Sequence, residues 1–238
     1  MKSGVARSVV ATAALVSLAL TSTSPPTMAS THDGKPKVLL HVRPVTTKNV
    51  CQAAYLGSCQ EAVTQGSINE FYDVYLLVAR GTQPGLAGVQ LGIDYQGGFK
   101  FEGGERPIDI FSFGLCAQLG FQTPTPPWPS PGGGIMMVWG DYGDGGCVMD
   151  DVNVGGYFYM AAYEPAFLRV IPRPVDQVLK VSNCSSVEIT LNELADAGYA
   201  WFSDTGLTGC NPCNEPCMGV AVEPTTWSRI KAQVVGGR

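Results

Sequence analysis

Residues 71–95 read FYDVYLLVAR-GTQPG-LAGVQLGIDY, two apolar runs separated by five residues that include Pro84 and two glycines. The first run, 71–79, is apolar at odd and even positions alike except at Asp73, which is typical of a central strand covered on both faces. The second run, 87–95, alternates large apolar side chains with small or polar ones, which predicts a strand with one buried face. The short glycine- and proline-containing connection favours a hairpin, so we expect these two strands to pair.

Outside this stretch, the chain consists largely of short apolar runs divided by turn residues, which indicates an all-β domain. The runs that predict further strands are 38–42, 108–119, 135–139, 154–163, 167–171, 175–181, 199–202 and 219–222. Short helices are expected over 191–197, behind the capping-box pattern Thr190-Leu-Asn-Glu193, and in the tail 224–238. A single helical turn is expected near Glu61. The pattern as a whole predicts a two-layer antiparallel β-sandwich.

The N-terminal segment 1–29 has the features of a secretory signal peptide. Lys2 and Arg7 precede an apolar run that is shorter than the ~20 residues of a membrane-spanning helix. Small residues before Ser30 suit cleavage after Ala29, and retention of the segment as an anchor is the alternative. The remainder, 30–238, is expected to form one secreted domain, extracellular or periplasmic, with a cysteine-rich segment at 184–217.

Composition narrows the range of partners. Removing the segment 1–29 takes away two positive residues and no negative one, so the formal charge of −5 becomes −7. An acidic chain without a Lys/Arg cluster lacks the electrostatic footprint of a nucleic-acid-binding protein. No second apolar run of comparable length follows, so we expect no membrane insertion after the signal is cleaved.

The chain has eight cysteines, all of them after the signal segment, and in an oxidising compartment they are expected to form disulfides. They are Cys51, Cys59, Cys116, Cys147, Cys184, Cys210, Cys213 and Cys217. Sequence proximity favours Cys51 with Cys59. Cys116 is expected to pair with Cys147 because both flank strands around one long loop, which leaves the last four to pair among themselves. The alternatives for Cys210-Asn-Pro-Cys213 are a redox dithiol, which the prolines disfavour, and a zinc site with Cys184 and Cys217.

Residues 85–95, GLAGVQLGIDY, resemble the glycine-rich strand pair of cohesin-type and related carbohydrate-binding β-sandwiches. This resemblance implies an Ig-like or cohesin-like jelly roll, and it covers about 25 residues. Over most of the chain after the signal segment, the sequence is also similar to uncharacterised exported bacterial proteins. They share the hairpin, the strand FSFGLC, a Trp-Pro loop ending in three glycines, and an end with the pattern TTWxxIK. That similarity implies no activity.

Candidate catalytic groups are few. The chain has only two histidines, His32 and His41, and no nucleophile-elbow, zincin or phosphate-loop pattern. We expect His41 to be a structural residue of the strand 38–42. Carboxylates for glycoside hydrolysis could be drawn from the acidic turn or from Asp94 and Asp109, but no pattern in the sequence brings a pair into one cleft.

Aromatic and acidic residues offer the clearest candidates for binding. Trp128 lies in the loop 123–134, which contains five prolines, and Trp139 and Tyr142 follow it closely. Rings of this kind suit a sugar face or a protein partner, although Trp128 could instead fold back as a loop anchor. Asp141 and Asp144 lie in a glycine-rich turn that could offer oxygen ligands to calcium, the one cofactor considered.

We therefore expect a secreted, disulfide-stabilised structural or interaction module without catalytic activity. The alternative is a carbohydrate-binding module that uses the Trp128 loop, with calcium in the acidic turn. A glycoside hydrolase-like enzyme is a third hypothesis. The expected partner is an extracellular protein or a glycan.

Overall fold

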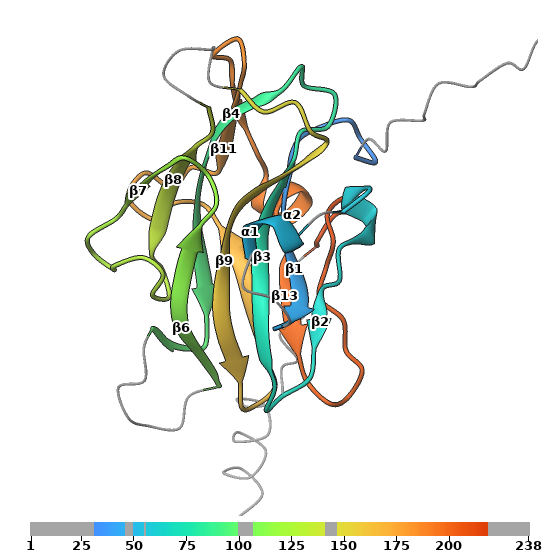
Figure 1. Ribbon diagram of the computed structural model, residues 1–238, viewed down its shortest axis with the longest axis vertical. Coiled ribbons are helices and arrows are strands. Elements are labelled where there is room, and N and C mark those ends of the chain that lie inside the picture. The colour runs from blue at the N-terminus through green and yellow to red at the C-terminus, as the bar shows by residue number, and fades with distance from the viewer. Residues whose placement is uncertain (1–30, 46–49, 55, 100–106, 141–146, 219–238) are drawn as a thin grey trace, which may run out of the picture.

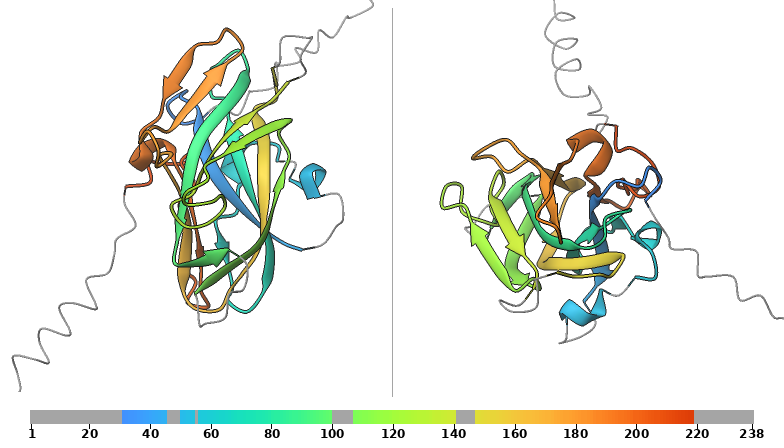
Figure 2. Two further views of the ribbon diagram at one scale, coloured as in Figure 1. Left: turned by 90° about the vertical axis from the view of Figure 1, so that its left-hand side faces the viewer. Right: turned by 90° about the horizontal axis from the view of Figure 1, so that it is seen from above.

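The computed structural model describes residues 31–45, 50–54, 56–99, 107–140 and 147–218, which fold into a two-layer β-sandwich (Figures 1 and 2). Sheet A has the strand order β1 (Lys37–Pro44), β3 (Phe71–Ala79), β9 (Val152–Ala162), β6 (Ile108–Leu115) and β5 (Gly97–Phe99). The central path of sheet B is β12 (Glu188–Thr190), β11 (Lys180–Asn183), β4 (Leu86–Tyr95), β10 (Ala166–Ile171), β13 (Tyr199–Phe202) and β2 (Gln65–Gly66). β8 (Gly134–Val138) pairs with β4, and β7 (Leu119–Gln122) extends the sheet beyond β8. The pairs β5–β6 and β13–β2 are parallel, and the other strand pairs are antiparallel.

The main core lies between the two sheets and follows the alternation of the strands. Val74, Leu76 and Val78 of β3 face Leu91 and Ile93 of β4 and their neighbours, and all are essentially inaccessible to water. The predicted all-β sandwich is therefore confirmed, because two sheets enclose one apolar layer.

The predicted hairpin is wrong, although both of its strands exist. β3 pairs with β1 and β9, whereas β4 pairs with β8, β10 and β11, so residues 80–85 cross from one sheet to the other. The crossing is tight at Gly81, which has φ +59° and lies against the backbone of Gly34 and Lys35. A side chain at Gly81 would meet that backbone. Arg80 fixes the start of the crossing with an ion pair to Asp151 at 2.6 Å.

β3 is covered on both faces, as its sequence predicts. Its outward side chains, Tyr75, Leu77 and Ala79, form a second apolar cluster with Leu39 of β1. This cluster lies under α1 (Val50–Ala53) and the 3₁₀ turn η1 (Cys59–Glu61), which is the helical turn expected near Glu61. Tyr75 ties the layers together because its hydroxyl donates to the Val50 carbonyl oxygen at 2.9 Å.

All eight cysteines are paired, but most of the expected pairings are wrong. The disulfides are Cys51–Cys116, Cys59–Cys213, Cys147–Cys184 and Cys210–Cys217, with Cα–Cα distances of 5.5 to 6.0 Å. Cys51 and Cys59 do not pair with each other because the segment that carries α1 and η1 is bonded at both cysteines to other parts of the chain, whereas Cys210 and Cys217 are joined over seven residues. Cys210 and Cys213 have different partners and no cysteine is free, which excludes the redox dithiol and the zinc site as alternatives.

The remaining differences from the sequence-based expectations concern the ends of elements and four short strands that were not expected, β2, β5, β7 and β12. The helix α2 (Glu193–Asp196) is capped by Asn192, whose side chain accepts from the backbone N–H groups of Leu194 and Ala195, and Thr190 belongs to β12. The strand predicted over 175–181 begins only at Lys180.

The signal segment, the strand 219–222 and the tail helix lie outside the described residues. Within the described part, no helix is long and apolar enough to cross a membrane.

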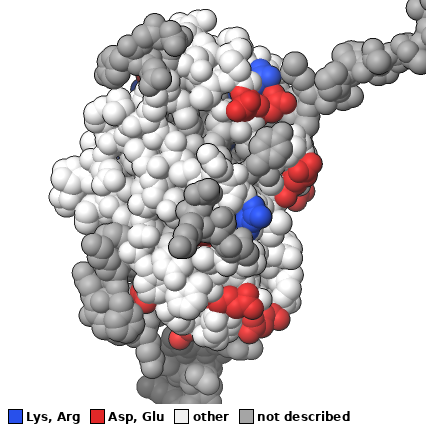
Figure 3. All heavy atoms as spheres, viewed as in Figure 1, with Lys and Arg blue, Asp and Glu red and all other residues white. Residues whose placement is uncertain are grey.

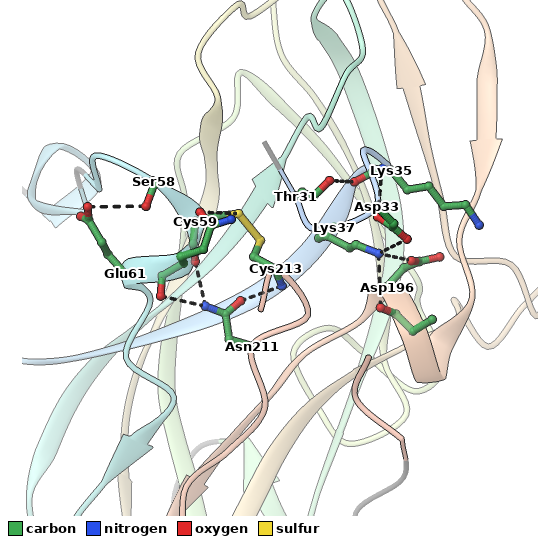
Figure 4. Close-up of a disulfide and its surroundings, with 12 residues drawn as sticks. Thr31, Asp33, Lys35, Lys37, Ser58, Cys59, Glu61, Asp196, Asn211 and Cys213 are labelled. Atoms are coloured by element: carbon green, nitrogen blue, oxygen red, sulfur yellow. Dashed lines mark hydrogen bonds and ion pairs between the residues drawn. A yellow bond between two sulfur atoms is a disulfide. The ribbon is translucent and has the colours of Figure 1, made fainter. Parts of the chain in front are cut away.

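A buried lysine anchors the start of β1 (Figure 4). The Lys37 side chain is inaccessible to water, and its Nζ lies 2.6 Å from an oxygen of Asp196 and 2.9 Å from an oxygen of Asp33. Asp196 is itself buried at the end of α2. The ion pair therefore fixes the first strand of sheet A to α2, which precedes the last strand of sheet B.

We expect Lys37→Met to lower the free energy of unfolding by about 3–5 kcal/mol, because it leaves the Asp196 carboxylate buried without its cation. The measurement is urea unfolding of the oxidised protein. Lys35→Ala removes an exposed ammonium two residues away and should change the free energy by less than about 0.5 kcal/mol. Equal effects of the two substitutions would contradict an anchoring role for Lys37.

Candidate functional site

The two tryptophans expected at a binding surface are buried. Trp128 is 4% exposed and packs edge-on against Phe113, with ring centroids 5.1 Å apart, and against Phe158 at 5.6 Å. Trp139 is 5% exposed and donates from Nε1 to the Val154 carbonyl oxygen. Neither ring offers a free face, so the expectation that they contact a ligand is wrong. Tyr142 lies outside the described residues.

The loop 123–134 folds back over the core, which is why it can bury Trp128. The Thr123 hydroxyl donates to the carbonyl oxygens of Pro126 and Gly134 and accepts from the Gly134 N–H. The Tyr95 hydroxyl donates to the Pro129 carbonyl oxygen from beneath the loop. These bonds join the two ends of the loop and hold it against the core, so the tryptophan is a loop anchor.

If Trp128 is an anchor, Trp128→Ala should lower the free energy of unfolding by about 3–5 kcal/mol, as expected for removing a buried aromatic side chain. Phe121→Ala is the matched control, because that ring is 57% exposed on β7, and it should cost less than about 0.5 kcal/mol. Chemical denaturation of both variants compares the two values. A stable Trp128→Ala protein would mean that the ring contributes little to the fold.

The acidic candidates do not come together among the described residues. Asp141 and Asp144 fall outside them, and Asp151 is paired with Arg80. No group of three His, Cys, Asp or Glu side chains in the described part of the chain could hold a metal ion. Asp94 is paired with Arg169 on the outer face of sheet B, and Asp109 lies on the outer face of sheet A. The carboxylate pair considered for hydrolysis is therefore divided between opposite faces.

His41 lies in β1 at the edge of a groove with a volume of about 580 Å³. Its Nδ1 accepts the backbone N–H of Val63 at 3.0 Å, and its ring is stacked near Tyr75. Burial lowers the pKa of His41 below its ordinary 6.5, and the charge of Arg43 lowers it further. These contacts agree with the structural role expected for His41.

Other polar groups of the groove also have partners within the fold. The Tyr72 hydroxyl accepts from the Ser67 N–H and donates to Glu70, and an Asp204 oxygen accepts from the Ile68 N–H. Arg43 donates to the Ala53 carbonyl oxygen. The groove is thus a seam between β1 and the segment that carries β2, held by local bonds.

The lowered pKa of His41 predicts a loss of stability in weak acid. The unfolded chain takes up the proton near pH 6.5 and the folded chain only at lower pH, so the stability contributed by the neutral ring is lost as the pH falls below 6.5. His41→Gln should therefore show a smaller decline in the free energy of unfolding between about pH 7 and about pH 5. His32→Gln, at an exposed position, should keep the wild-type slope; a wild-type slope in His41→Gln would refute the assignment.

The outer face of sheet A carries an exposed aromatic cluster that the sequence did not reveal. Phe71 of β3, Phe111 of β6 and Tyr159 of β9 have ring centroids 5.5 to 5.8 Å apart, and we call these three residues the aromatic patch. Phe71 is half exposed, and the other two are partly exposed. Most of the surface seen from this side is uncharged where it is not drawn in grey (Figure 3).

Strand register brings these three rings together. Phe71 lies opposite Ala161 of β9, two residues from Tyr159, and Ala161 lies opposite Asp109 of β6. A shift of register between Ile110 and Ser112 marks a bulge at Phe111. Alternation in the run 154–163 could have placed Tyr159 on one face, but nothing local in the sequence predicts its neighbours.

Two buried carboxylates accompany the aromatic patch. Asp73 lies opposite Tyr159, and burial raises the pKa of its carboxyl group. Asp109 is 1% exposed, and among the described residues neither of its oxygens has a hydrogen-bond partner. A face with exposed rings and buried acids contains unfavourable features for an isolated protein, so it is the best candidate for a functional surface.

Comparison with known proteins assigns no family. No protein-family model matches the chain, and no curated protein matches it. Similar solved structures include the cohesin module of a family 33 glycoside hydrolase from Clostridium perfringens ATCC13124, with a TM-score of 0.39 and 7% identity over 71% of this chain and 97% of that one. A chain of the CaDoc0917–CaCohA2 complex has a TM-score of 0.38 and 11% identity, over 70% of this chain and 98% of its own length. The resemblance to cohesin modules is therefore weak.

Proposed function

We propose that this protein is a secreted, disulfide-stabilised interaction module without catalytic activity, and that it binds a partner protein through the aromatic patch. The half-exposed ring of Phe71, in contact with Phe111 and Tyr159, is the observation that carries the proposal. Aromatic side chains in contact with each other on a mostly uncharged surface are typical of the centre of a protein interface.

The arrangement of the rings favours a protein over a glycan. The Phe111 ring is inclined by 39° to that of Phe71 and by 46° to that of Tyr159. The Phe71 and Tyr159 rings are within 17° of parallel, but the tilted Phe111 ring packs against both, so the three rings together form a ridged apolar surface and not one flat platform on which successive sugars could stack. Trp128, the residue on which the glycan hypothesis depended, lies inside the core.

Four disulfides support an oxidising location, because such bonds persist mainly in secreted and periplasmic proteins. The proposed absence of catalysis follows from the environment of the candidate groups. His41 accepts a backbone hydrogen bond within a strand, and the described carboxylates do not form a pair in the groove. These features suit a rigid scaffold that presents a surface.

The test is photocrosslinking in the cells that produce the protein. Val45 donates its backbone N–H to the Phe71 carbonyl oxygen and is itself exposed, so p-benzoylphenylalanine in place of Val45 probes the patch without removing a ring. We expect a discrete covalent adduct with one protein. Phe71→Ala should reduce its yield by about tenfold or more, as expected for the loss of a central interface residue.

The matched control places the same photocrosslinker at Val175, which is 67% exposed and precedes β11 of sheet B. This position should not give the adduct. The same adduct from both positions, an adduct insensitive to Phe71→Ala, or an adduct that contains carbohydrate and no protein would each contradict the proposal.

A further inference from the structure

The Asp109 carboxylate is the least satisfied polar group on the aromatic face. It projects from β6 on the side of sheet A opposite to the core, because its neighbours Ile108 and Ile110 both point inward. Its two oxygens are inaccessible to water, and in the described part of the chain they have no hydrogen-bond partner. A buried carboxylate of this kind is costly, since it has lost its hydration and gained nothing in return.

The strands next to this carboxylate carry several aromatic residues. Directly across from Asp109 on β9 is Ala161, which is also buried. Tyr159 and Tyr163 lie on either side of Ala161, within reach of Asp109 as diagonal neighbours. Phe71 and Phe111 come from the strands that flank β9, and their rings meet above it with centroids 5.7 Å apart.

The polar ring of Tyr163 interacts with Asp109 and is partly exposed. Tyr163 is 39% exposed at the end of β9, where its backbone N–H donates to the Pro107 carbonyl oxygen. Burial raises the pKa of the Tyr163 hydroxyl and the charge of Asp109 raises it further, which agrees with their proximity. Access of a ligand to the buried Asp109 requires a side chain to move, and the partly exposed Tyr163 ring can rotate without breaking a backbone bond of the sheet.

We propose that Asp109 binds an arginine side chain of the partner protein. The neighbouring aromatic residues would contact the same side chain, and they are Phe71, Phe111, Tyr159 and Tyr163. The inference rests on the proposed function and specifies the chemistry of its partner. A guanidinium fits better than an ammonium for two reasons. Its planar fork can donate to both free oxygens of one carboxylate, and its faces stack on aromatic rings. Charge complementarity also favours this occupant, because no cation in the described part of the chain pairs with Asp109.

The first test measures binding of a single side chain. The oxidised full-length chain is titrated with N-acetylarginine amide and with N-acetylcitrulline amide, a neutral analogue of nearly the same shape. Shifts in the aromatic proton resonances report binding. We expect shifts with the arginine derivative only, and we expect Asp109→Asn to weaken its binding by about tenfold or more. Equal binding of the two compounds, or an unaffected Asp109→Asn variant, would overturn the proposal, as would the absence of any binding of the arginine derivative to the wild type.

Asp94→Asn is the matched control, since Asp94 is on the outer face of sheet B and is already paired with Arg169. It should bind the arginine derivative within about twofold of the wild type. The thermal unfolding of Asp109→Asn gives a second, independent readout. Removing an unpaired buried charge should raise the unfolding midpoint. A lowered midpoint would mean that Asp109 already has a partner within the chain, and the arginine proposal would fail.

The photocrosslinking assay separates this inference from the proposed function. If the Val45 adduct forms and depends on Phe71 but is unchanged in Asp109→Asn, the patch binds a protein without an arginine at Asp109. If no adduct forms while the arginine derivative binds, the interaction proposed for the whole protein fails and the local site stands. Loss of the adduct in Asp109→Asn, with the Asp94→Asn adduct retained, is the result expected if both are right.

Discussion

The burial of β3 on both faces is the constraint on which the rest of the structure depends. One face of this strand closes the main core against sheet B, and both of its edges are paired, with β1 and β9, so the next long strand belongs to the other sheet. The other face is covered by α1 and η1, and two disulfides bond this covering segment to the rest of the chain. That cover extends only over the half of β3 near Ala79. At the opposite end of the strand, Phe71 and its neighbours remain at the surface, and this is how a covered sheet comes to have an exposed aromatic patch.

Local patterns in the sequence predicted what depends on local chemistry. The run 71–79 is apolar at odd and even positions, which predicted a strand covered on both sides. The alternation in the other runs predicted the sandwich. The connection at 80–85 was misjudged because glycine and proline suit a tight turn whether the next strand pairs with the previous one or crosses to the other sheet. The pairing of Cys51 and Cys59 failed for a similar reason. Distance along the chain does not reveal that both cysteines belong to a cover bonded elsewhere.

The aromatic patch could not be predicted from the sequence, because its three residues are brought together only by the register of the strands. Phe71, Phe111 and Tyr159 belong to strands far apart in the chain, and a bulge at Phe111 contributes to their meeting. For Trp128 the sequence predicted exposure where the structure shows burial, because a loop rich in proline and glycine is usually at the surface. Hydrogen bonds from Thr123 and Tyr95 hold that loop against the core and bury the indole, and no periodic pattern records such bonds.

The two halves of sheet A, one covered by α1 and η1 and the other carrying the aromatic patch, contribute differently to stability and to the proposed function. In the covered half, each disulfide typically contributes about 2–4 kcal/mol, and the second apolar cluster adds the burial of Leu39, Tyr75 and Leu77. In the open half, an exposed phenylalanine and a buried carboxylate without a partner among the described residues oppose the stability of the isolated chain. Proteins tolerate such features where binding requires them, provided that the remaining structure is stable enough. A sandwich fastened by four disulfides has that reserve, and a partner that satisfied Asp109 and covered Phe71 would remove both penalties on binding.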